Sequence, residues 1–501
     1  HLVASVKTPS KQERTLDGFW DGGSLWRLRF APDELGEWQV NLYLTSAEGA
    51  VLQSASATFV CGVGVGETRF EQHGPIRLAA NKRHLEHADG TPFFWLADTA
   101  WNGPLRATEE EWARYLQTRR RQQFTTVQWV STHWRAAPNG DRTGQLAFTG
   151  HEQITINPAF FQRLDSYVKA TAQAGLLNVA VLLWAVGSGA NPQIDPGFGL
   201  PEDQAILLAR YMVARWGAYP IVWILAGDGK YQGDFAARWR RIGRAVFGDR
   251  PHAPVMMHCG GQQWPAEEFR REPWLDMLGY QSGHGDSDDT LRWIVNGPPA
   301  QEWSREPRLF QLNVEPAYEN HLAYHSRQPH TAQSVRQAIY WSLLNAPTAG
   351  VTYGGHGVWG WDDGSAPSVD HPNSGTPLPW DAALNMPAAE AMAHLADLFT
   401  GIEWWRLRPA PLLLAEQPGV SDVRRTILAS QSETGDLVVA YVPRGDRITI
   451  RTSGLPANLV ATWFNPRTGA STVIGPVDIS TVNHFPTPDA EDWVLILSKQ
   501  R

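Results

Sequence analysis

The chain has 501 residues, of which 43% are hydrophobic and 19% charged, so it can bury a core and is not a disordered protein. Its net charge of −8 argues against nucleic acid as the main partner, because phosphate binding requires a basic face. The sequence also has no basic amphipathic stretch for a membrane surface, and no apolar run of about 18 residues that could span a membrane.

Tryptophan and cysteine usage narrow the chemistry further. Each of the 24 Trp carries an indole N–H that needs a partner in a core, so many of these rings are expected to present flat apolar faces. Such faces stack on the C–H faces of sugar rings. The two cysteines, Cys61 and Cys259, leave one disulfide open but exclude a disulfide framework and a zinc ribbon. Cys259 ends an apolar run and is predicted to be a buried thiol.

The first residues are HLVASVKTPSK, without an initiating Met, which indicates a processed or trimmed product whose targeting peptide is not visible. We expect a secreted or periplasmic bacterial protein, with a cytoplasmic one as the alternative.

The length fits about three domains. Residues 1–70 are predicted to form a small β-sandwich, because short alternating segments such as LWRLRF (25–30), WQVNLYL (38–44) and ATFVCGV (57–63) are separated by turn residues. Residues 403–501 are predicted to form a second sandwich from five further strands. These are 425–432, 436–443, 448–454, 459–466 and 493–499.

Between these two regions, residues 71–402 alternate strand and helix. The strands are nearly continuous apolar runs, as expected where both faces are covered. Eight strand–helix units predict a (β/α)8 barrel. A doubly wound sheet is the alternative, but no GxGxxG opens the first helix. The predicted strands are 92–98, 125–131, 177–185, 220–228, 254–260, 275–281, 308–315 and 349–354. The predicted helices are 109–123, 159–175, 202–218, 233–248, 289–295 and 332–346, and a closing helix is 388–399.

Barrel enzymes build their sites at the carboxyl ends of the strands, so the residues that close or follow each strand are the candidates. Carboxylates that stand among aromatic rings at one rim of the barrel favour glycoside hydrolysis. The residues of this rim are the candidates for binding the sugar. They are Asp98, Trp101, His133, Trp134, Trp184, Tyr280, His284, Tyr318, Glu319, Tyr353, His356, Trp359, Trp361 and Asp362.

Asp228 and Glu315 form the best catalytic pair. Glycoside hydrolysis needs one carboxyl group to protonate the leaving oxygen and a second to attack carbon or activate water. Each of the two follows a strongly apolar strand, where a charge is costly unless it faces an open site. Strands four and seven face each other across an eight-stranded barrel, so their ends can flank a bound sugar.

Several of these residues have alternative roles. Asp228 and Asp98 could each cap the helix that follows, and Asp98 could instead bind a sugar hydroxyl. Glu319 could support Glu315 or replace it as nucleophile. Asp362 and Asp363 fit loop ligands for hydroxyls better than acids. A zinc site is a weaker alternative, because no motif spacing relates the four histidines that could form it. These are His133, His258, His284 and His356.

Three segments carry a family resemblance. FFWLADTAW (93–101), IVWILAGD (221–228) and QLNVEPAYE (311–319) resemble the apiosidase-like catalytic domain of bacterial glycoside hydrolases, glycoside hydrolase family 140 and its relatives. Residues 17–40 resemble the Ig-like domain that often precedes it, and the C-terminal region resembles a collagen-binding-type β-domain that often follows it.

The resemblance implies a (β/α)8 barrel with Asp228 and Glu315 as the catalytic pair, and a role in degrading plant or microbial polysaccharides. It implies neither a metal nor an organic cofactor, and it leaves the sugar, the linkage and the oligomeric state open. Specificity is expected in the loop after strand eight (354–375).

The mechanism expected is that of a retaining, exo-acting glycosidase with Asp228 as acid/base and Glu315 as nucleophile. Retention requires the two carboxyl groups to lie about 5–5.5 Å apart, whereas inversion requires about 6.5–9.5 Å. A non-catalytic glycan-binding protein and a polysaccharide lyase with Tyr280, Tyr318 or His284 as base are the rival functions.

Overall fold

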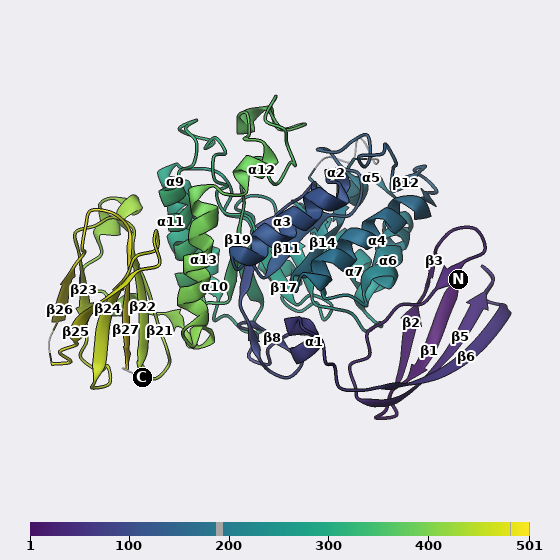
Figure 1. The fold of residues 1–501 in the computed structure, drawn as a ribbon, viewed down its shortest axis with the longest axis horizontal. Helices are drawn as coiled ribbons and strands as arrows, with labels where there is room; N and C mark the ends of the chain where they lie inside the picture. The colour runs from purple at the N-terminus through teal and green to yellow at the C-terminus, as the bar shows by residue number, and fades with distance from the viewer. Residues whose placement is uncertain (187–193, 481, 500–501) are drawn as a thin grey trace.

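The computed structural model describes residues 1–186, 194–480 and 482–499. Figure 1 shows a central barrel between an N-terminal sheet and a C-terminal sheet, which lie on opposite sides of it. This arrangement confirms the predicted fold class.

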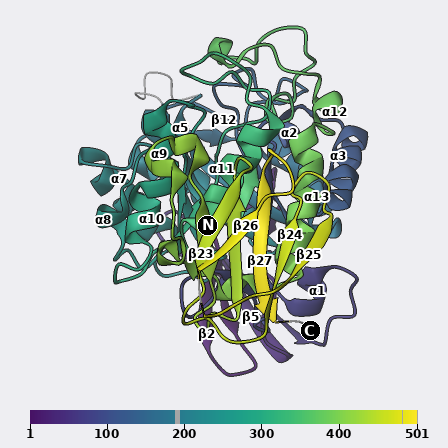
Figure 2. The ribbon, with the colours of Figure 1, turned by 90° about the vertical axis from the view of Figure 1, so that its left-hand side faces the viewer.

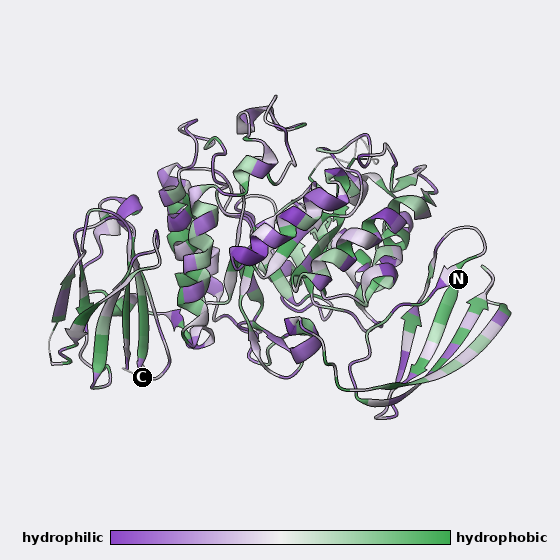
Figure 3. Ribbon diagram, viewed as in Figure 1, coloured by the Kyte–Doolittle hydropathy of each residue, from purple (hydrophilic) through white to green (hydrophobic). Residues whose placement is uncertain are grey.

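Eight parallel strands in the described part of the chain form the barrel. Their order is β18-β17-β16-β15-β14-β11-β10-β19, and β18 contacts β19, so the two ends of the sheet meet. Every residue of these strands is buried, and Figure 3 shows their hydrophobic character against the more hydrophilic helices. The strands are β10 (Trp95–Thr99), β11 (Thr126–Val130), β14 (Leu177–Trp184), β15 (Ile221–Gly227), β16 (Val255–His258), β17 (Met277–Tyr280), β18 (Phe310–Asn313) and β19 (Gly350–Tyr353).

Helices cover the outside of the barrel. They begin at local signals: α3, for example, starts with a capping box in which Thr108 and Glu111 each accept a hydrogen bond from the other's backbone N–H. None of the described helices is both long and apolar enough to cross a membrane. The longer helices are α3 (Glu109–Arg121), α4 (Pro158–Gln173), α6 (Glu202–Trp216), α7 (Asp234–Phe247), α9 (Asp288–Asn296), α11 (Ala332–Leu344) and α13 (Pro387–Thr400).

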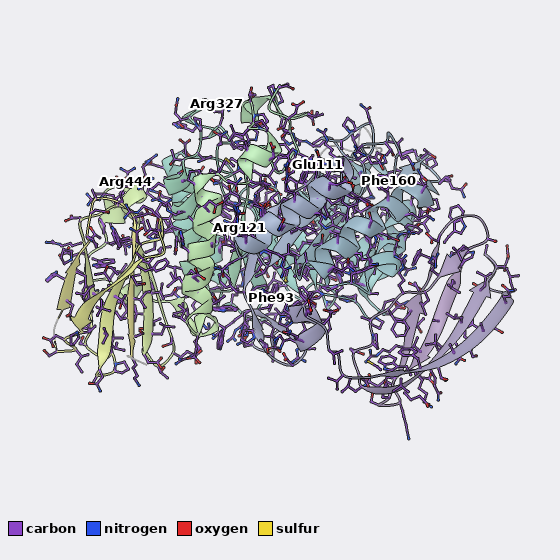
Figure 4. All side chains as sticks on the ribbon, in the orientation of Figure 1. Phe93, Glu111, Arg121, Phe160, Arg327 and Arg444 are labelled. Carbon is purple, nitrogen blue, oxygen red and sulfur yellow. The ribbon has the colours of Figure 1, made fainter. Side chains whose placement is uncertain are left out.

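Short elements in the loops after the strands build one end of the barrel, at the top of Figure 1. The loop between β18 and α11 rises to the same end, where Arg327 is labelled in Figure 4. This end is the one where barrel enzymes place their sites. The short elements are α2 (Gly103–Arg106), the hairpin β12 (Phe148–Thr149) and β13 (Thr155–Ile156), α5 (Pro196–Gly199), α8 (Ala266–Phe269) and α12 (Trp380–Ala383); α10 (Pro298–Glu302) precedes β18.

The N-terminal region is anchored to the barrel by a buried ion-pair network. Arg215 of α6, with no exposed surface, lies 2.9 Å from Asp21 and 2.8 Å from Asp165. Phe19 packs edge-on against Tyr211. The antiparallel sheet has the order β2 (Glu13–Asp17), β1 (Leu2–Lys7), β5 (Gly36–Thr45), β6 (Val51–Cys61), beside the hairpin β3 (Phe19–Trp20) and β4 (Trp26–Arg27). Helix α1 (Arg69–His73) and the small sheet β7 (Ile76–Leu78), β8 (Leu85–His87) and β9 (Pro92–Phe93) lead into the barrel.

The C-terminal sheet packs against α11 and α13, as Figures 1 and 2 both show. One apolar core continues across this junction, with Trp341 and Phe399 from the helices and Tyr441 from the sheet. Arg336 of α11 binds Asp492 through two hydrogen bonds of 2.9 and 2.8 Å, and both side chains are buried. The larger sheet has the order β20 (Arg408–Pro409), β21 (Leu428–Gln431), β22 (Leu437–Val442), β27 (Trp493–Lys499), β24 (Leu459–Phe464), β25 (Ser471–Pro476); β23 (Arg447–Arg451) pairs with β26 (Val482–Pro486).

Candidate active site

Two carboxylates stand at the carboxyl ends of strands β15 and β18. Asp228 follows directly after β15 and is partly exposed, whereas Glu315 lies two residues beyond β18 and is 7% exposed. The backbone of Asp228 is left-handed, with φ of +50°. Gly227 before it allows a close approach, because a Cβ there would lie 2.6 Å from the ring of Trp184. A left-handed non-glycine residue at a strand end is typical of functional sites.

Two histidines hold the carboxylate of Glu315. Nε2 of His284 lies 3.0 Å from Oε1, and Nε2 of His258 lies 3.2 Å from Oε2. His258 ends β16 and His284 follows β17, so three neighbouring strand ends converge on one carboxylate. Both rings are buried, at 0% and 4% exposure.

The second nitrogen of each ring faces a backbone donor. The N–H of Asp228 donates to Nδ1 of His258 over 2.9 Å, and the N–H of Tyr318 donates to Nδ1 of His284 over 3.3 Å. A nitrogen that accepts from an N–H carries no proton, so the proton of each neutral ring is on Nε2, the atom that faces Glu315.

These contacts separate the pKa values of the two carboxyl groups. Burial, reinforced by the negative charge of Glu315, raises the pKa of Asp228 to about 6. Burial opposes ionisation of Glu315 too, but hydrogen bonding and electrostatic attraction from His258 and His284 outweigh it and hold the pKa of Glu315 well below its usual range. Asp228 therefore keeps a proton at a pH where Glu315 is ionised.

A closed ring of side-chain contacts passes through Glu315. From His258, the ring continues to Trp101 (centroids 5.6 Å apart) and Trp184 (6.0 Å), and Trp184 lies 4.3 Å from Trp134. On its other side the ring returns to Glu315 through residues of the loops after β17, β18 and β19. These are His371, Trp359, His356, His321 and His284, with successive centroids 4.4–6.1 Å apart; His371 lies 6.4 Å from Trp134.

The structure thus brings together most of the aromatic candidates. Trp101, Trp134, Trp184, His284 and Trp359 belong to the ring described above. Tyr318 packs on His284 with centroids 4.4 Å apart, and His356 is also a member. Burial and the negative charge of Glu315 raise the pKa of Tyr318 well above its usual range, so its hydroxyl stays protonated beside Glu315.

Three other candidates serve the scaffold. Asp98 has no exposed surface, and its Oδ2 accepts hydrogen bonds of 2.7 Å from Arg119 and Tyr115. Glu319 accepts from the backbone N–H of Ala388 in the first turn of α13 and, over 2.8 Å, from the hydroxyl of Tyr353. Asp98, Glu319 and Tyr353 are therefore engaged in contacts that stabilise the fold beneath the site.

The remaining candidates lie outside the ring. His133 accepts from the N–H of Ala147, and Tyr280 packs between Trp264 and Trp293. Trp361 stacks on Trp380, with centroids 4.3 Å apart. Asp362 accepts a hydrogen bond from the hydroxyl of Ser368 over 2.7 Å.

Several residues of the site are not among the sequence-predicted ligands. His258 was recognisable as a strand-end residue. His321 and His371 come from long loops and show no signal of spacing. Tyr324 is 58% exposed beside His284, and Arg135 binds His371 over 2.8 Å.

Two further observations bear on other kinds of site. Among the described residues, no group of three or more His, Cys, Asp or Glu is placed to hold a metal ion. Cys61 and Cys259 are free thiols, and Cys259 is buried as predicted.

A cavity of about 910 Å³ lies between the N-terminal sheet and the barrel, at the opposite end from Asp228, and is lined by Phe30, Tyr219 and Arg250 among others.

A carboxyl group that keeps its proton, a carboxylate that stays ionised, and aromatic rings around both, at the mouth of a (β/α)8 barrel, define a glycoside hydrolase. Residues 79–406 match the family described as "Apiosidase-like, catalytic domain". The chain belongs to this family, and it is a glycosidase.

The flanking regions match other families. Residues 409–498 match "Putative collagen-binding domain of a collagenase", and residues 1–45 match a domain of unknown function, DUF5060. No curated protein matches the chain in sequence.

Solved structures share the fold. One described as a glycoside hydrolase is 22% identical with a TM-score of 0.74 and covers 87% of this chain and 98% of its own. A glycoside hydrolase family 5 protein from Bacteroides vulgatus is 20% identical with a TM-score of 0.74 and covers 86% and 94%. A third structure, from the same species, is 16% identical with a TM-score of 0.70 and covers 100% and 95%.

Proposed function

We propose that this glycosidase works by a retaining mechanism in which Asp228 is the acid/base and Glu315 the nucleophile. The opposite protonation of the two carboxyl groups supports Asp228 as the acid and Glu315 as the anion, and the anomeric configuration of the first product tests retention. The proton on Asp228 is available for the leaving oxygen, while the ionised Glu315 attacks the anomeric carbon and forms a glycosyl-enzyme. Asp228, now deprotonated, then takes a proton from the water that releases the sugar.

The ring favours exo action, in which the enzyme cleaves at the end of a plant or microbial oligosaccharide or polysaccharide. Side chains from loops all around the barrel close it, so it suits the end of a glycan better than the middle of a long chain. Aromatic faces fit the C–H faces of a sugar. The family name adds apiose-containing glycans to the candidate substrates.

Hydrolysis is tested on a panel of aryl glycosides, apiosides included, and of plant and bacterial polysaccharides. Proton NMR of the first product is expected to show the same anomeric configuration as the substrate. A first product of opposite configuration would contradict the nucleophilic role of Glu315 but leave hydrolysis intact. Absence of turnover with binding retained would favour a glycan-binding protein, and an unsaturated product absorbing in the ultraviolet would identify a lyase.

The pH dependence follows from the two pKa values. Activity requires Asp228 protonated, so kcat/KM is expected to fall as the pH rises through about 6. On the acid side it requires Glu315 ionised, so activity should persist below the ordinary pKa of a glutamate. The measurement is kcat/KM against pH on an aryl glycoside with a good leaving group. Asp228→Asn is the control, because it should lose the fall on the alkaline side; if it keeps that fall, another group is the acid.

A further inference from the structure

The two catalytic carboxyl groups are connected through His258. The backbone N–H of Asp228 donates to Nδ1 of this ring, and Nε2 of the same ring faces Glu315. The ring has no exposed surface and packs against Trp101, so it has little freedom to turn. The main chain of Asp228 and the side chain of Glu315 therefore contact opposite nitrogens of one imidazole.

The backbone contact restricts the protonation state of His258. A proton on Nδ1 would point at the N–H of Asp228, and a backbone N–H cannot accept a hydrogen bond. The imidazolium form and the Nδ1–H tautomer would both break the 2.9 Å bond. The left-handed backbone at Asp228, with φ of +50°, places that N–H. His284 has the same constraint from the N–H of Tyr318.

We propose that His258, assisted by His284, is a positioning residue that holds Glu315 as an anion through a neutral Nε2–H tautomer fixed by the backbone of Asp228. The inference rests on the proposed roles of Asp228 and Glu315.

The proposed roles of the two carboxyl groups require the imidazole of His258 to be neutral. A hydrogen bond from a neutral donor acts at short range on the atom it touches, whereas a positive charge acts on both carboxyl groups in a medium of low dielectric constant. An imidazolium at this place would favour ionisation of Asp228 as well and remove the proton that the leaving group needs. A neutral His284, hydrogen-bonded to Glu315 over 3.0 Å, and a neutral His258, 3.2 Å from it, stabilise the anion and leave Asp228 protonated.

The other groups around the two rings are consistent with this. Tyr318, Tyr324 and His321 pack on His284. Burial, with His284 and His356 nearby, lowers the pKa of His321, so it adds no positive charge. Arg135, whose charge acts on Asp228, is paired with Asp370 over 3.1 Å.

Long-range proton–nitrogen NMR of the ¹⁵N-histidine-labelled full chain tests the tautomers without any substrate. Two rings, assigned by their loss in His258→Gln and His284→Gln, are expected to show the Nε2–H pattern at neutral pH. An imidazolium or Nδ1–H pattern for His258 at that pH would overturn the proposal, whether or not the enzyme turns over a substrate.

Kinetics of a matched pair of variants test the positioning role. A glutamine amide nitrogen can reach the place of Nε2 and donate to Glu315, whereas an asparagine amide reaches only the place of Nδ1. His258→Gln is expected to stay within about tenfold of wild-type kcat, and His258→Asn to lose about 10²- to 10³-fold, the scale for one preorganised donor. The acid-side fall of kcat/KM should also move to higher pH in His258→Asn.

Equal loss in both variants, or a loss confined to KM, would contradict the role. If the wild type turns over no substrate on the panel, the proposed function fails, and the NMR result still decides the tautomer. If His258→Asn does not fold, the wild-type spectrum and His258→Gln remain as tests.

Discussion

Glu315→Ala is expected to lower kcat by about 10⁴-fold or more, the scale of loss when a covalent nucleophile is removed from other hydrolases. The carboxylate is 7% exposed and is contacted by His258 and His284. Azide is expected to restore turnover, because it can enter the vacated space and attack the anomeric carbon while Asp228 protonates the leaving oxygen. The product would be a glycosyl azide of inverted configuration, identified by NMR.

Glu319→Ala is the matched control for this experiment. Glu319 lies four residues further on and caps α13, so its loss is expected to reduce stability and leave kcat within about tenfold. If Glu319→Ala were the inactive variant that azide restores, Glu319 would be the nucleophile and the assignment of Glu315 would be wrong.

Asp98→Ala is expected to destabilise the barrel by about 3–5 kcal/mol, because it leaves the guanidinium of Arg119 buried without its counter-ion. Arg119 has no exposed surface, and it also donates to Gln122 and to the backbone carbonyl of Leu384, so it cannot turn out to solvent. Urea unfolding followed by tryptophan fluorescence measures the change. Below the unfolding transition, KM is expected to be that of the wild type.

Two comparisons decide the role of Asp98. Arg241→Ala breaks the exposed pair with Glu202 and should leave the free energy of unfolding almost unchanged. Asp98→Leu combined with Arg119→Met removes both buried charges and should recover most of the lost stability. A raised KM at unchanged stability in Asp98→Ala would instead mean that Asp98 binds a sugar hydroxyl.

The barrel could be predicted because its strands and helices carry strong local signals. All eight predicted barrel strands are present, each within a few residues of its predicted bounds, since buried parallel strands are continuous apolar runs. Strands of the C-terminal sheets such as β25 and β26 were not predicted, because strands that are mostly exposed lack that signal.

The candidate site was only partly predictable. Asp98 and Asp228 both follow apolar strands, and nothing in the sequence distinguishes them. In the structure Asp98 faces the helix side and meets Arg119, whereas Asp228 adopts a left-handed backbone at the mouth. Tyr353 and Tyr280 were placed at the rim by strand position, but their side chains point to the surrounding helices.

The sequence by itself determined the strand–helix alternation, the abundance of aromatic residues and the two carboxylates at strand ends, because each depends on residue type and local spacing. Only the tertiary structure decided which strand-end side chains meet Glu315 at the mouth of the barrel and which nitrogen of His258 and His284 accepts from the backbone. Those properties depend on contacts between segments far apart in the chain, such as the backbone of Asp228 with His258 and His258 with Glu315.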